Sequence, residues 1–529
     1  PLTFHPADPK TLLYATNVLW RTRNGGQSWD IISPDLSREQ PALPASIGDF
    51  KTVEMETMER LGVIYALGPS PLDRQLIWAG TDDGLLHVTR NGGRSWSNVT
   101  PPSLRPWDKV SNLDAGHFDE QTAYAAINAI RLDDMRPHIL RTHDGGATWT
   151  EIVNGLPASG PINVVREDPK QPGLLFAGSE RAVYFSVDDG DSWQELRMNM
   201  PATSIRDLVV HEDDLVIGTH GRAIWIMDNL SPLRELAEVS GSSAPHLFSP
   251  ALATRVRWNM FSDTPLPPEE PTGENPPDGT TLDYYLPADA REVRIEILDE
   301  DGGVVRAYSS SDTPERLDPV MMRHPTYWIR PERLPGTTPG HHRVVWDLRY
   351  APPPGIQRGY DIAATYRNTP SDPVGPFVHP GRYTVRLSVD GAVQEKPLAV
   401  RLDPRVEISD RDLELNTRYS MQVYTANAEA QALRDRIDAE LSSATGSKRE
   451  RLAALRGEGD AENPNIHYGS ITEVPADEES LVSLQEKFVY LLKVLQSADA
   501  RPTDAAMASA DALTERLDAL EQRYAKIVD

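Results

Sequence analysis

The chain has 529 residues, enough for about three or four domains of roughly 150 residues each. It carries 53 Lys and Arg against 79 Asp and Glu, a net charge of −26. This balance argues against nucleic acid or an anionic membrane as the main partner, because phosphate groups are bound by clustered cations. There is no cysteine, which excludes disulfides and thiolate sites, and the apolar stretches fall short of the ~18 residues of a membrane span.

One short pattern occurs four times in the first 200 residues. It reads Ser or Thr, any residue, Asp or Asn, any residue, Gly, any residue, Ser or Thr, and Trp, and we call it the box motif. The four copies are residues 22–29, 89–96, 142–149 and 186–193. Each follows a β-rich stretch, and the spacing of 44 to 67 residues between copies is typical of four-stranded repeat units, some with inserted loops.

The residue types of the box motif indicate a structural role. An Asp or Asn side chain accepts hydrogen bonds from its own turn, and Gly provides a backbone position with positive φ. The Trp is a large apolar side chain that we expect to be mostly buried, in equivalent positions of successive units. The residues assigned to this role are Asn24, Trp29, Asn91, Trp96, Asp144, Trp149, Asp188 and Trp193.

These motifs resemble the Asp-box, or bacterial neuraminidase (BNR) repeat, of sialidases, sortilins and xyloglucanase-type glycoside hydrolases. Residues 77–85, 131–137 and 218–228 also resemble a large family of secreted bacterial proteins described as glycosyl hydrolases or sortilin-like. The resemblance implies a β-propeller in a secreted, periplasmic or cell-surface protein. It also implies that the chain matches the carboxy-terminal part of proteins about twice as long. The first catalytic Asp of xyloglucanase-type enzymes then falls outside it, so no catalytic residue is carried over.

Residues 1–230 are predicted to form the propeller blades. Residues 208–228 have strand character without a box motif, and they bring the number of repeat units to five. Propellers use roughly four to eight blades, and the sortilin-like ones use more. We therefore expect the amino-terminal part of the same precursor, or another chain, to complete the propeller. Without that partner, the first unit should expose an apolar face.

The middle of the chain is predicted to be a linker followed by a second β domain. Residues 231–280 are a Pro-rich linker, and residues 281–403 contain six short strands with alternating apolar residues and Asp-Gly turns. This pattern favours an immunoglobulin-like β-sandwich. Residues 340–347 and 380–385 resemble the Ig-like domain of the flagellar hook-capping family. A long Pro- and Gly-containing loop is expected over residues 351–378.

Residues 404–529 are predicted to form a helical hairpin or bundle. Ser409 is a candidate N-cap, and apolar residues at helical spacing follow it, with breaks at Gly446 and over residues 457–475. The fold class predicted for the whole chain is mainly β with an α-helical carboxy-terminal region.

Glycoside hydrolysis needs two carboxylates about 5–10 Å apart, one of them with a raised pKa. For Asp133 and Asp134, we expect Arg131 to pair with one of the two, which lowers a carboxyl pKa and disfavours a general-acid role. Asp82 and Asp83 precede a Gly between two strands, as in a turn. The acidic candidates near loop ends are Asp82, Asp83, Asp114, Asp119, Asp133 and Asp134.

Other residues are candidates for ligand binding. Trp107 lies in a Pro-rich loop and is expected to be an exposed aromatic, whereas His220 is expected to make a structural hydrogen bond. The ligand-binding candidates are Asp82, Asp83, Trp107, Arg131, His220 and Arg222. No metal or nucleotide motif occurs and the acidic loops lack EF-hand spacing for Ca²⁺, so neither a cofactor nor a metal is expected.

Two functions are compatible with this pattern. The first is a secreted bacterial binding or scaffold module for a protein or polysaccharide ligand, in the manner of sortilin-like propellers. The alternative is a glycoside hydrolase of the xyloglucanase or sialidase type. Two facing carboxylates in an aromatic cleft at the mouth of the propeller would favour the enzyme, and a flat or plugged mouth would favour binding. The binding module is the function that the sequence favours.

Overall fold

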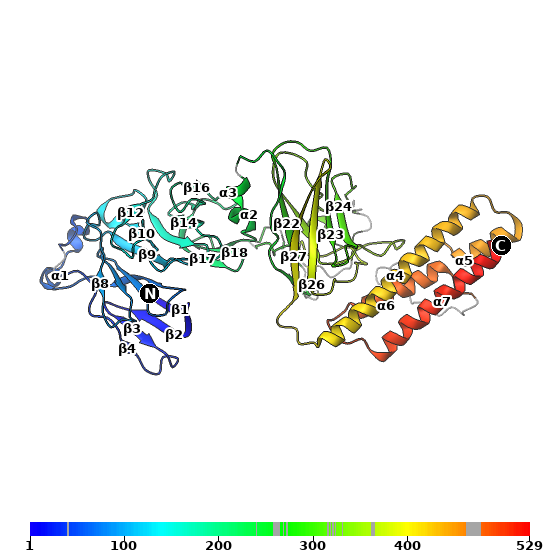
Figure 1. Cartoon of the computed structure of the whole chain (residues 1–529), viewed down its shortest axis with the longest axis horizontal. Coiled ribbons are helices and arrows are strands. Elements are labelled where there is room, and N and C mark those ends of the chain that lie inside the picture. Colours follow the sequence, from blue (N-terminus) through cyan, green and yellow to red (C-terminus); the bar gives the residue numbers. More distant parts are fainter. Residues whose placement is uncertain are drawn as a thin grey trace. The chain divides into compact units, whose positions relative to one another are not determined.

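The structure is a computed structural model of the whole chain. It describes all residues except 40–41, 240, 258–264, 268, 271–272, 315–316, 318, 320–321, 323, 331, 361–365, 462–477 and 529. The chain divides into two compact units, Pro1–Ser240 and Gly241–Asp529. It is mainly β, with many small sheets, and its carboxy-terminal region is helical (Figure 1). Within the described ranges, no helix is long and apolar enough to cross a membrane.

The described part of the first unit contains five antiparallel sheets, each with its strands in chain order. Sheet 1 is β1 (Leu2–His5), β2 (Asp8–Ala15), β3 (Leu19–Thr22) and β4 (Asp30–Ile31); sheet 2 is β5 (Ile64–Pro69), β6 (Ile77–Thr81), β7 (Leu86–Thr89) and β8 (Ser97–Asn98). Sheet 3 is β9 (Lys109–Ala115), β10 (Ala123–Asn128), β11 (His138–Thr142) and β12 (Thr150–Glu151); sheet 4 is β13 (Ile162–Glu167), β14 (Leu175–Ser179), β15 (Val183–Ser186) and β16 (Gln194–Glu195). Sheet 5 is β17 (Ser204–His211), β18 (Asp214–His220) and β19 (Ile224–Met227).

The five sheets pack face to face in series. Four apolar cores join sheet 1 to sheet 2, sheet 2 to sheet 3, and so on to sheet 5. Strands β6, β10 and β14 are therefore buried along their whole length, since each lies in a sheet covered on both faces. This explains why these strands are continuously apolar in sequence rather than alternating.

The box motifs form the turns between the third and fourth strands of sheets 1 to 4. In the first copy, the Asn24 side chain accepts a hydrogen bond from the Ser28 amide at 3.1 Å, and Thr22 Oγ1 accepts one from the Gly26 amide at 3.0 Å. The same contacts recur in the other three copies. The turns are thus closed by their own side chains, with a Gly at positive φ in each.

The box Trp also joins each sheet to the preceding one. The Nε1–H groups of Trp96, Trp149 and Trp193 donate to the carbonyls of Ile32, Val99 and Ile152, each at 2.9 Å. Each acceptor lies three residues after the box Trp of the preceding sheet. The prediction that these side chains are mostly buried is correct for Trp193, which is 4% exposed, whereas the other three are half-buried.

Sheets 1 and 5 each have one open face. Leu2, Tyr14, Trp20 and Ile31 are successive cross-strand partners in sheet 1 and so share a face, together with Phe4. Leu2, Phe4 and Ile31 are 63, 62 and 58% exposed. On sheet 5, Val209, Ile224 and Ile226 are exposed. The exposed apolar face expected on the first unit is therefore present.

Four short helices and one further 3-10 turn interrupt or follow the sheets of the first unit. They are η1 (Ala45–Phe50), α1 (Val53–Thr57), η2 (Ile130–Leu132), α2 (Ser231–Arg234) and α3 (Leu236–Val239). Residues 231–239 were expected to begin the linker. They are helical instead, because Leu233 and Leu236 pack on the core shared by sheets 4 and 5.

The second unit begins with two sheets that share one core. One consists of β20 (His246–Leu247), β22 (Thr280–Leu286) and β25 (Gly340–Trp346). The other consists of β21 (Ala253–Arg255), β27 (Ala392–Leu402), β26 (Gly381–Val389), β23 (Val293–Leu298) and β24 (Val304–Ser309). A short turn, η3 (Thr326–Trp328), lies between β24 and β25. The six strands expected over residues 281–403 correspond to β22, β23, β24, β25, β26 and β27. Residues 361–365 of the expected loop lie outside the described residues.

Four helices around a second core complete this unit. They are α4 (Asp410–Leu441), α5 (Gly446–Arg456), α6 (Leu481–Leu495) and α7 (Asp504–Val528). Ser409 is the N-cap of α4, as predicted, and its hydroxyl accepts a hydrogen bond from the Asp412 amide. Most of the break expected over residues 457–475 lies outside the described residues. Arg255 of β21 and Asp499 form an ion pair at 2.5 Å, with both side chains almost fully buried.

Candidate functional site

Asp133, Asp134 and Arg131 lie near sheets 2 and 3, but Arg131 and Asp134 have other partners than the sequence predicted. Arg131 Nη1 contacts Asp82 Oδ2 at 3.0 Å, so the expected pairing of Arg131 with Asp133 or Asp134 is wrong. Asp134 is instead held by Arg136 at 2.7 Å and by Arg105 at 3.0 Å. The hydrogen bond from Arg136 lowers the pKa of Asp134, and this excludes Asp134 as a general acid.

Asp133 and Trp107 occupy unusual backbone positions in the same region. Asp133 caps η2 in the left-handed region, with φ of 58°, and its side chain is exposed. Trp107 also has positive φ, and it is 8% exposed because its Nε1–H donates to the Ala42 carbonyl at 2.6 Å. The expectation of an exposed aromatic platform at Trp107 is therefore wrong.

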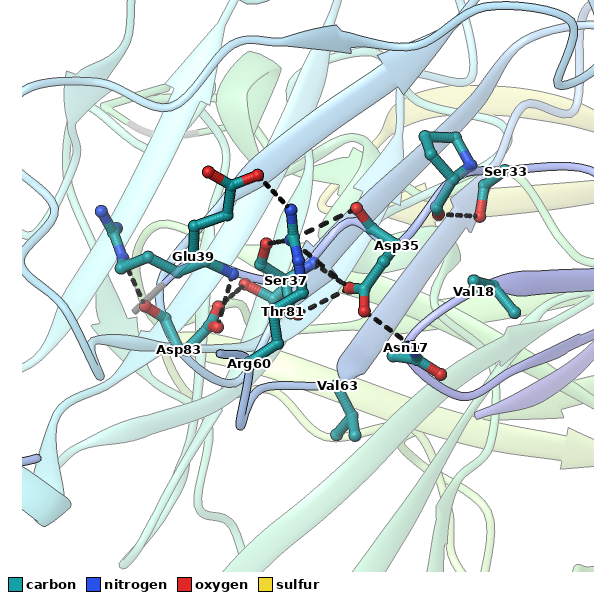
Figure 2. Close-up of polar contacts among 12 residues, drawn as sticks. Asn17, Val18, Ser33, Asp35, Ser37, Glu39, Arg60, Val63, Thr81 and Asp83 are labelled. Carbon is teal, nitrogen blue, oxygen red and sulfur yellow. Dashed lines mark hydrogen bonds and ion pairs between the residues drawn. The ribbon is translucent and has the colours of Figure 1, made fainter. Parts of the chain in front are cut away.

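Asp83 belongs to the group of polar residues that Figure 2 shows. Its carboxylate accepts hydrogen bonds from the Thr81 hydroxyl at 2.5 Å and from the Arg38 amide at 2.8 Å. Burial raises the pKa of Asp83. Nearby, Arg60 contacts Glu39 at 2.6 Å (Figure 2). The hydrogen bond from the Arg38 amide ties the segment after β4 to the β6–β7 turn, so Asp83 has a structural role.

His220 and Arg222 lie apart from these groups, at the turn between β18 and β19. Both residues are exposed. The His220 carbonyl accepts a long hydrogen bond from Thr203 Oγ1, at 3.5 Å. The structure thus brings Arg131 and Asp82 together but leaves His220 and Arg222 on a separate surface.

A cavity of about 290 Å³ lies where the first strands of the five sheets meet. Its wall is mostly apolar, with residues from β1, β5, β9, β13 and β17. Four ionisable side chains also line it: Asp114, His117, Arg166 and Glu167. A cavity with apolar walls and a few convergent polar groups is the usual form of a small-ligand site, and this volume is near the lower end of the usual range.

The four ionisable residues of this central cavity are tied to one another. Asp114 accepts hydrogen bonds from the Glu167 amide at 2.8 Å and from the Arg166 guanidinium at 3.3 Å. His117 Nε2 lies 3.6 Å from Asp114 Oδ2. The His117 amide donates to Glu167 Oε2 at 2.7 Å. Because of these contacts, β9, β13 and the loop after β9 hold the two carboxylates in fixed positions.

The two carboxylates have different electrostatic environments. Glu167 is 5% exposed, and this burial raises its pKa. Asp114 instead contacts the Arg166 guanidinium at 3.3 Å. Burial by itself lowers the pKa of His117, but the hydrogen bond to Asp114 and the nearby carboxylate charges outweigh it, so the pKa is raised overall. Two acids in unlike environments are a common basis of acid–base catalysis.

Sequence reasoning found only part of the central cavity. Asp114 was among the acidic candidates, but His117, Arg166 and Glu167 were missed. The available signal was the charged run from Arg166 to Asp168, directly after an apolar strand. Among the described residues, no three His, Asp or Glu side chains gather as a metal site.

Comparisons with known proteins find xyloglucanases that are similar to this chain at low identity. No family model matches the chain. The oligoxyloglucan-reducing end-specific xyloglucanase of Emericella nidulans is 22% identical over 173 residues, which are 32% of this chain and 19% of that enzyme. The matched residues of this chain therefore span only about a fifth of the length of this curated relative.

Similar solved structures include GH74 xyloglucanases. The enzyme from Xanthomonas campestris is matched over 74% of this chain and 70% of its own, with 15% identity and a TM-score of 0.34. The GH74 enzyme of Niastella koreensis is matched over 74% and 56%, with 12% identity and a TM-score of 0.30.

Proposed function

We propose that the first unit is part of a β-propeller glycoside hydrolase and that the reaction takes place in the central cavity. The observation that carries this proposal is that Asp114 and Glu167 line one cavity, where the Asp114 carboxylate accepts a hydrogen bond from the Glu167 amide and burial raises the pKa of Glu167. Glu167, with its raised pKa, is the general acid that protonates the glycosidic oxygen. Asp114 is the charged partner that acts as base or nucleophile on the other side of the sugar.

The xyloglucanase relative supports this function better than the binding module that the sequence favoured. We infer that the substrate is the end of a β-glucan or xyloglucan oligosaccharide, because a cavity of about 290 Å³ has room for little more than a terminal sugar. The proposed location is outside the cytoplasm, where such polysaccharides occur.

The test is whether the 529-residue chain hydrolyses any of a panel of xyloglucan, β-glucan and sialoside oligosaccharides, with the release of reducing ends as the measured quantity. Glu167→Gln and Asp114→Asn should each lower kcat by about 10²–10⁴-fold. Glu120→Gln changes an exposed neighbouring carboxylate and is the matched control. The proposal fails if the parent chain hydrolyses none of these glycans, or if the control loses as much activity as the two cavity variants.

The binding or scaffold function remains as a second candidate because of the open face of sheet 1. Every other box Trp donates to a carbonyl of the preceding sheet, and no such bond from Trp29 is found within the described residues. Gly93, Gly146 and Gly190 pack against Ile32, Val99 and Ile152, whereas the equivalent Gly26 has only its own Trp29 nearby. Sheet 1 therefore has the box Trp and Gly that the other sheets use to contact the preceding sheet, but among the described residues no sheet lies against them.

We propose that a further sheet of the same kind packs on this face and accepts a hydrogen bond from Trp29. The carbonyls of Ile32, Val99 and Ile152 are already used, and the equivalent Leu196 packs on the core shared with sheet 5. In a second copy of this chain the same three carbonyls would be occupied, and the packing of sheet 5 would cover Leu196. The partner is thus another part of the same precursor or a separate chain.

Sedimentation velocity tests this second candidate. The chain by itself should self-associate weakly with rising concentration through its exposed apolar face, and Ile31→Lys should reduce this association. Val304→Lys, at a similarly exposed position in the second unit, is the matched control. A strict monomer at all concentrations, with β1 and β2 protected from amide exchange, would contradict the open face.

A further inference from the structure

A second, separate hollow lies between sheets 1 and 2, on the side of the box motifs. It has a volume of about 520 Å³. The described residues that line it are Asp8, Lys10, Arg21, Arg23, Arg74, Gln75, Asn91, Gly92 and Arg94. Five of these nine carry a positive charge and one carries a negative charge. In a chain with a net charge of −26, this concentration of cations is unusual.

The cations of this hollow differ from most other arginines of the first unit in lacking acidic partners. Arg60, Arg131, Arg136 and Arg141 each contact a carboxylate within 4 Å. No such contact is found among the described residues for the five cations of the hollow. The charges of Asp8 on Arg23 and of Asp30 on Arg21 offset these positive charges in part, at longer range, and the five cations repel one another.

Several contacts hold the hollow in shape. Arg21 Nη1 donates to the Gly92 carbonyl at 3.3 Å, and Arg94 Nε donates to the Asn91 carbonyl at 3.1 Å. Burial, with a further contribution from Arg23, lowers the pKa of Arg21, and its buried Nε has no hydrogen-bond partner in the described part of the chain. Arg21 is thus fixed, partly desolvated and next to like charge, a state that an anionic ligand would stabilise.

The lining also indicates the kind of anion. Guanidinium groups bind oxyanions through paired hydrogen bonds, and the volume is that of a small-ligand pocket rather than a single-ion site. The exposed amide of Gln75 adds a hydrogen-bonding group of the kind that sugar hydroxyls contact. A long nucleic acid fits less well, because the large negative charge of the rest of the chain repels it.

We propose that this hollow binds an acidic saccharide, one that carries sulfate or carboxylate groups. The site shares no lining residue with the central cavity, and it does not depend on any hydrolytic activity. It would let the protein hold an anionic polysaccharide while the central cavity remains free.

Isothermal titration calorimetry of the whole chain tests the proposal. The probes are sucrose octasulfate, trigalacturonate and, as the phosphate arm, inositol hexaphosphate, with sucrose and inorganic sulfate as reference ligands at matched ionic strength. We expect at least one acidic saccharide to bind more tightly than inorganic sulfate, with an affinity that falls as salt is added. Neutral sucrose should not bind.

Two charge-matched variants decide whether the hollow is responsible. Arg74→Gln with Arg94→Gln should weaken binding by at least about tenfold, because both side chains are exposed and no ion pair is found for either of them among the described residues. Arg181→Gln with Arg197→Gln removes the same charge from two exposed positions next to strands of sheet 4 and should leave binding unchanged. Equal loss in both variants, binding of inositol hexaphosphate alone, or no binding of either acidic saccharide would overturn the proposal.

Discussion

The contacts of the box Trp residues predict a large difference between two copies of the same motif. Trp193 is 4% exposed, it lies in the core between sheets 3 and 4, and its Nε1–H donates to the Ile152 carbonyl. Replacing such a side chain by Ala removes its buried surface and leaves a cavity, which costs about 3–5 kcal/mol. Trp29 is half-buried and has no equivalent bond, so Trp29→Ala should cost only about 1 kcal/mol.

Amide hydrogen exchange measured by mass spectrometry on the whole chain separates the two effects. Peptides that cover β14 and β15 report the opening free energy next to Trp193, and peptides that cover β2 and β3 report it next to Trp29. Trp193→Phe keeps most of the ring but removes the N–H donor, and it should account for about 1 kcal/mol of the total. If Trp29→Ala lowers the opening free energy as much as Trp193→Ala, the contacts between sheets do not explain the role of the box Trp.

Four further predictions follow from individual contacts. Hydrolysis should fall as pH rises through the raised pKa of Glu167, because the general acid is then deprotonated. The pKa of His117 is also raised, so the stability that its charged form contributes should be fully present below the ordinary histidine pKa of 6.5 and be lost at higher pH. Urea titrations of His117→Gln should lack that loss. Asp134→Asn should lower stability by about 2 kcal/mol, through its contacts with Arg105 and Arg136, without changing kcat in the glycan assay. Asp499→Asn should destabilise the second unit in thermal unfolding by about 3–5 kcal/mol, since it leaves Arg255 buried and unpaired, whereas the exposed Asp504→Asn should have little effect.

The repeat units and most strand positions could be predicted from the sequence, because both depend on local chemistry. A box motif closes its own turn through side chains two and four residues apart, so the pattern is visible in eight consecutive residues. The strands of the second unit alternate because one face of each sheet is buried, and the helix after Ser409 begins where a hydroxyl can cap it. These features need no information about distant residues.

The sites depended on contacts between residues far apart in the chain, and there the sequence was a poor guide. Arg131 was assigned to its sequence neighbours, but it contacts Asp82, 49 residues away. Trp107 has the setting of an exposed loop residue, yet the Ala42 carbonyl and its surroundings bury it.

Residue type and spacing by themselves thus determined the box turns, most strand positions and the helical carboxy-terminal region. Only the packing of five sheets in series decided which carboxylates meet. Asp114 and Glu167 belong to sheets 3 and 4, and they come together because the first strand of every sheet lines one cavity. Likewise, four nearly identical box motifs differ in their contacts, because Trp29 alone has no preceding sheet among the described residues to which its Nε1–H can donate. A neighbour of this kind is a property of the tertiary structure.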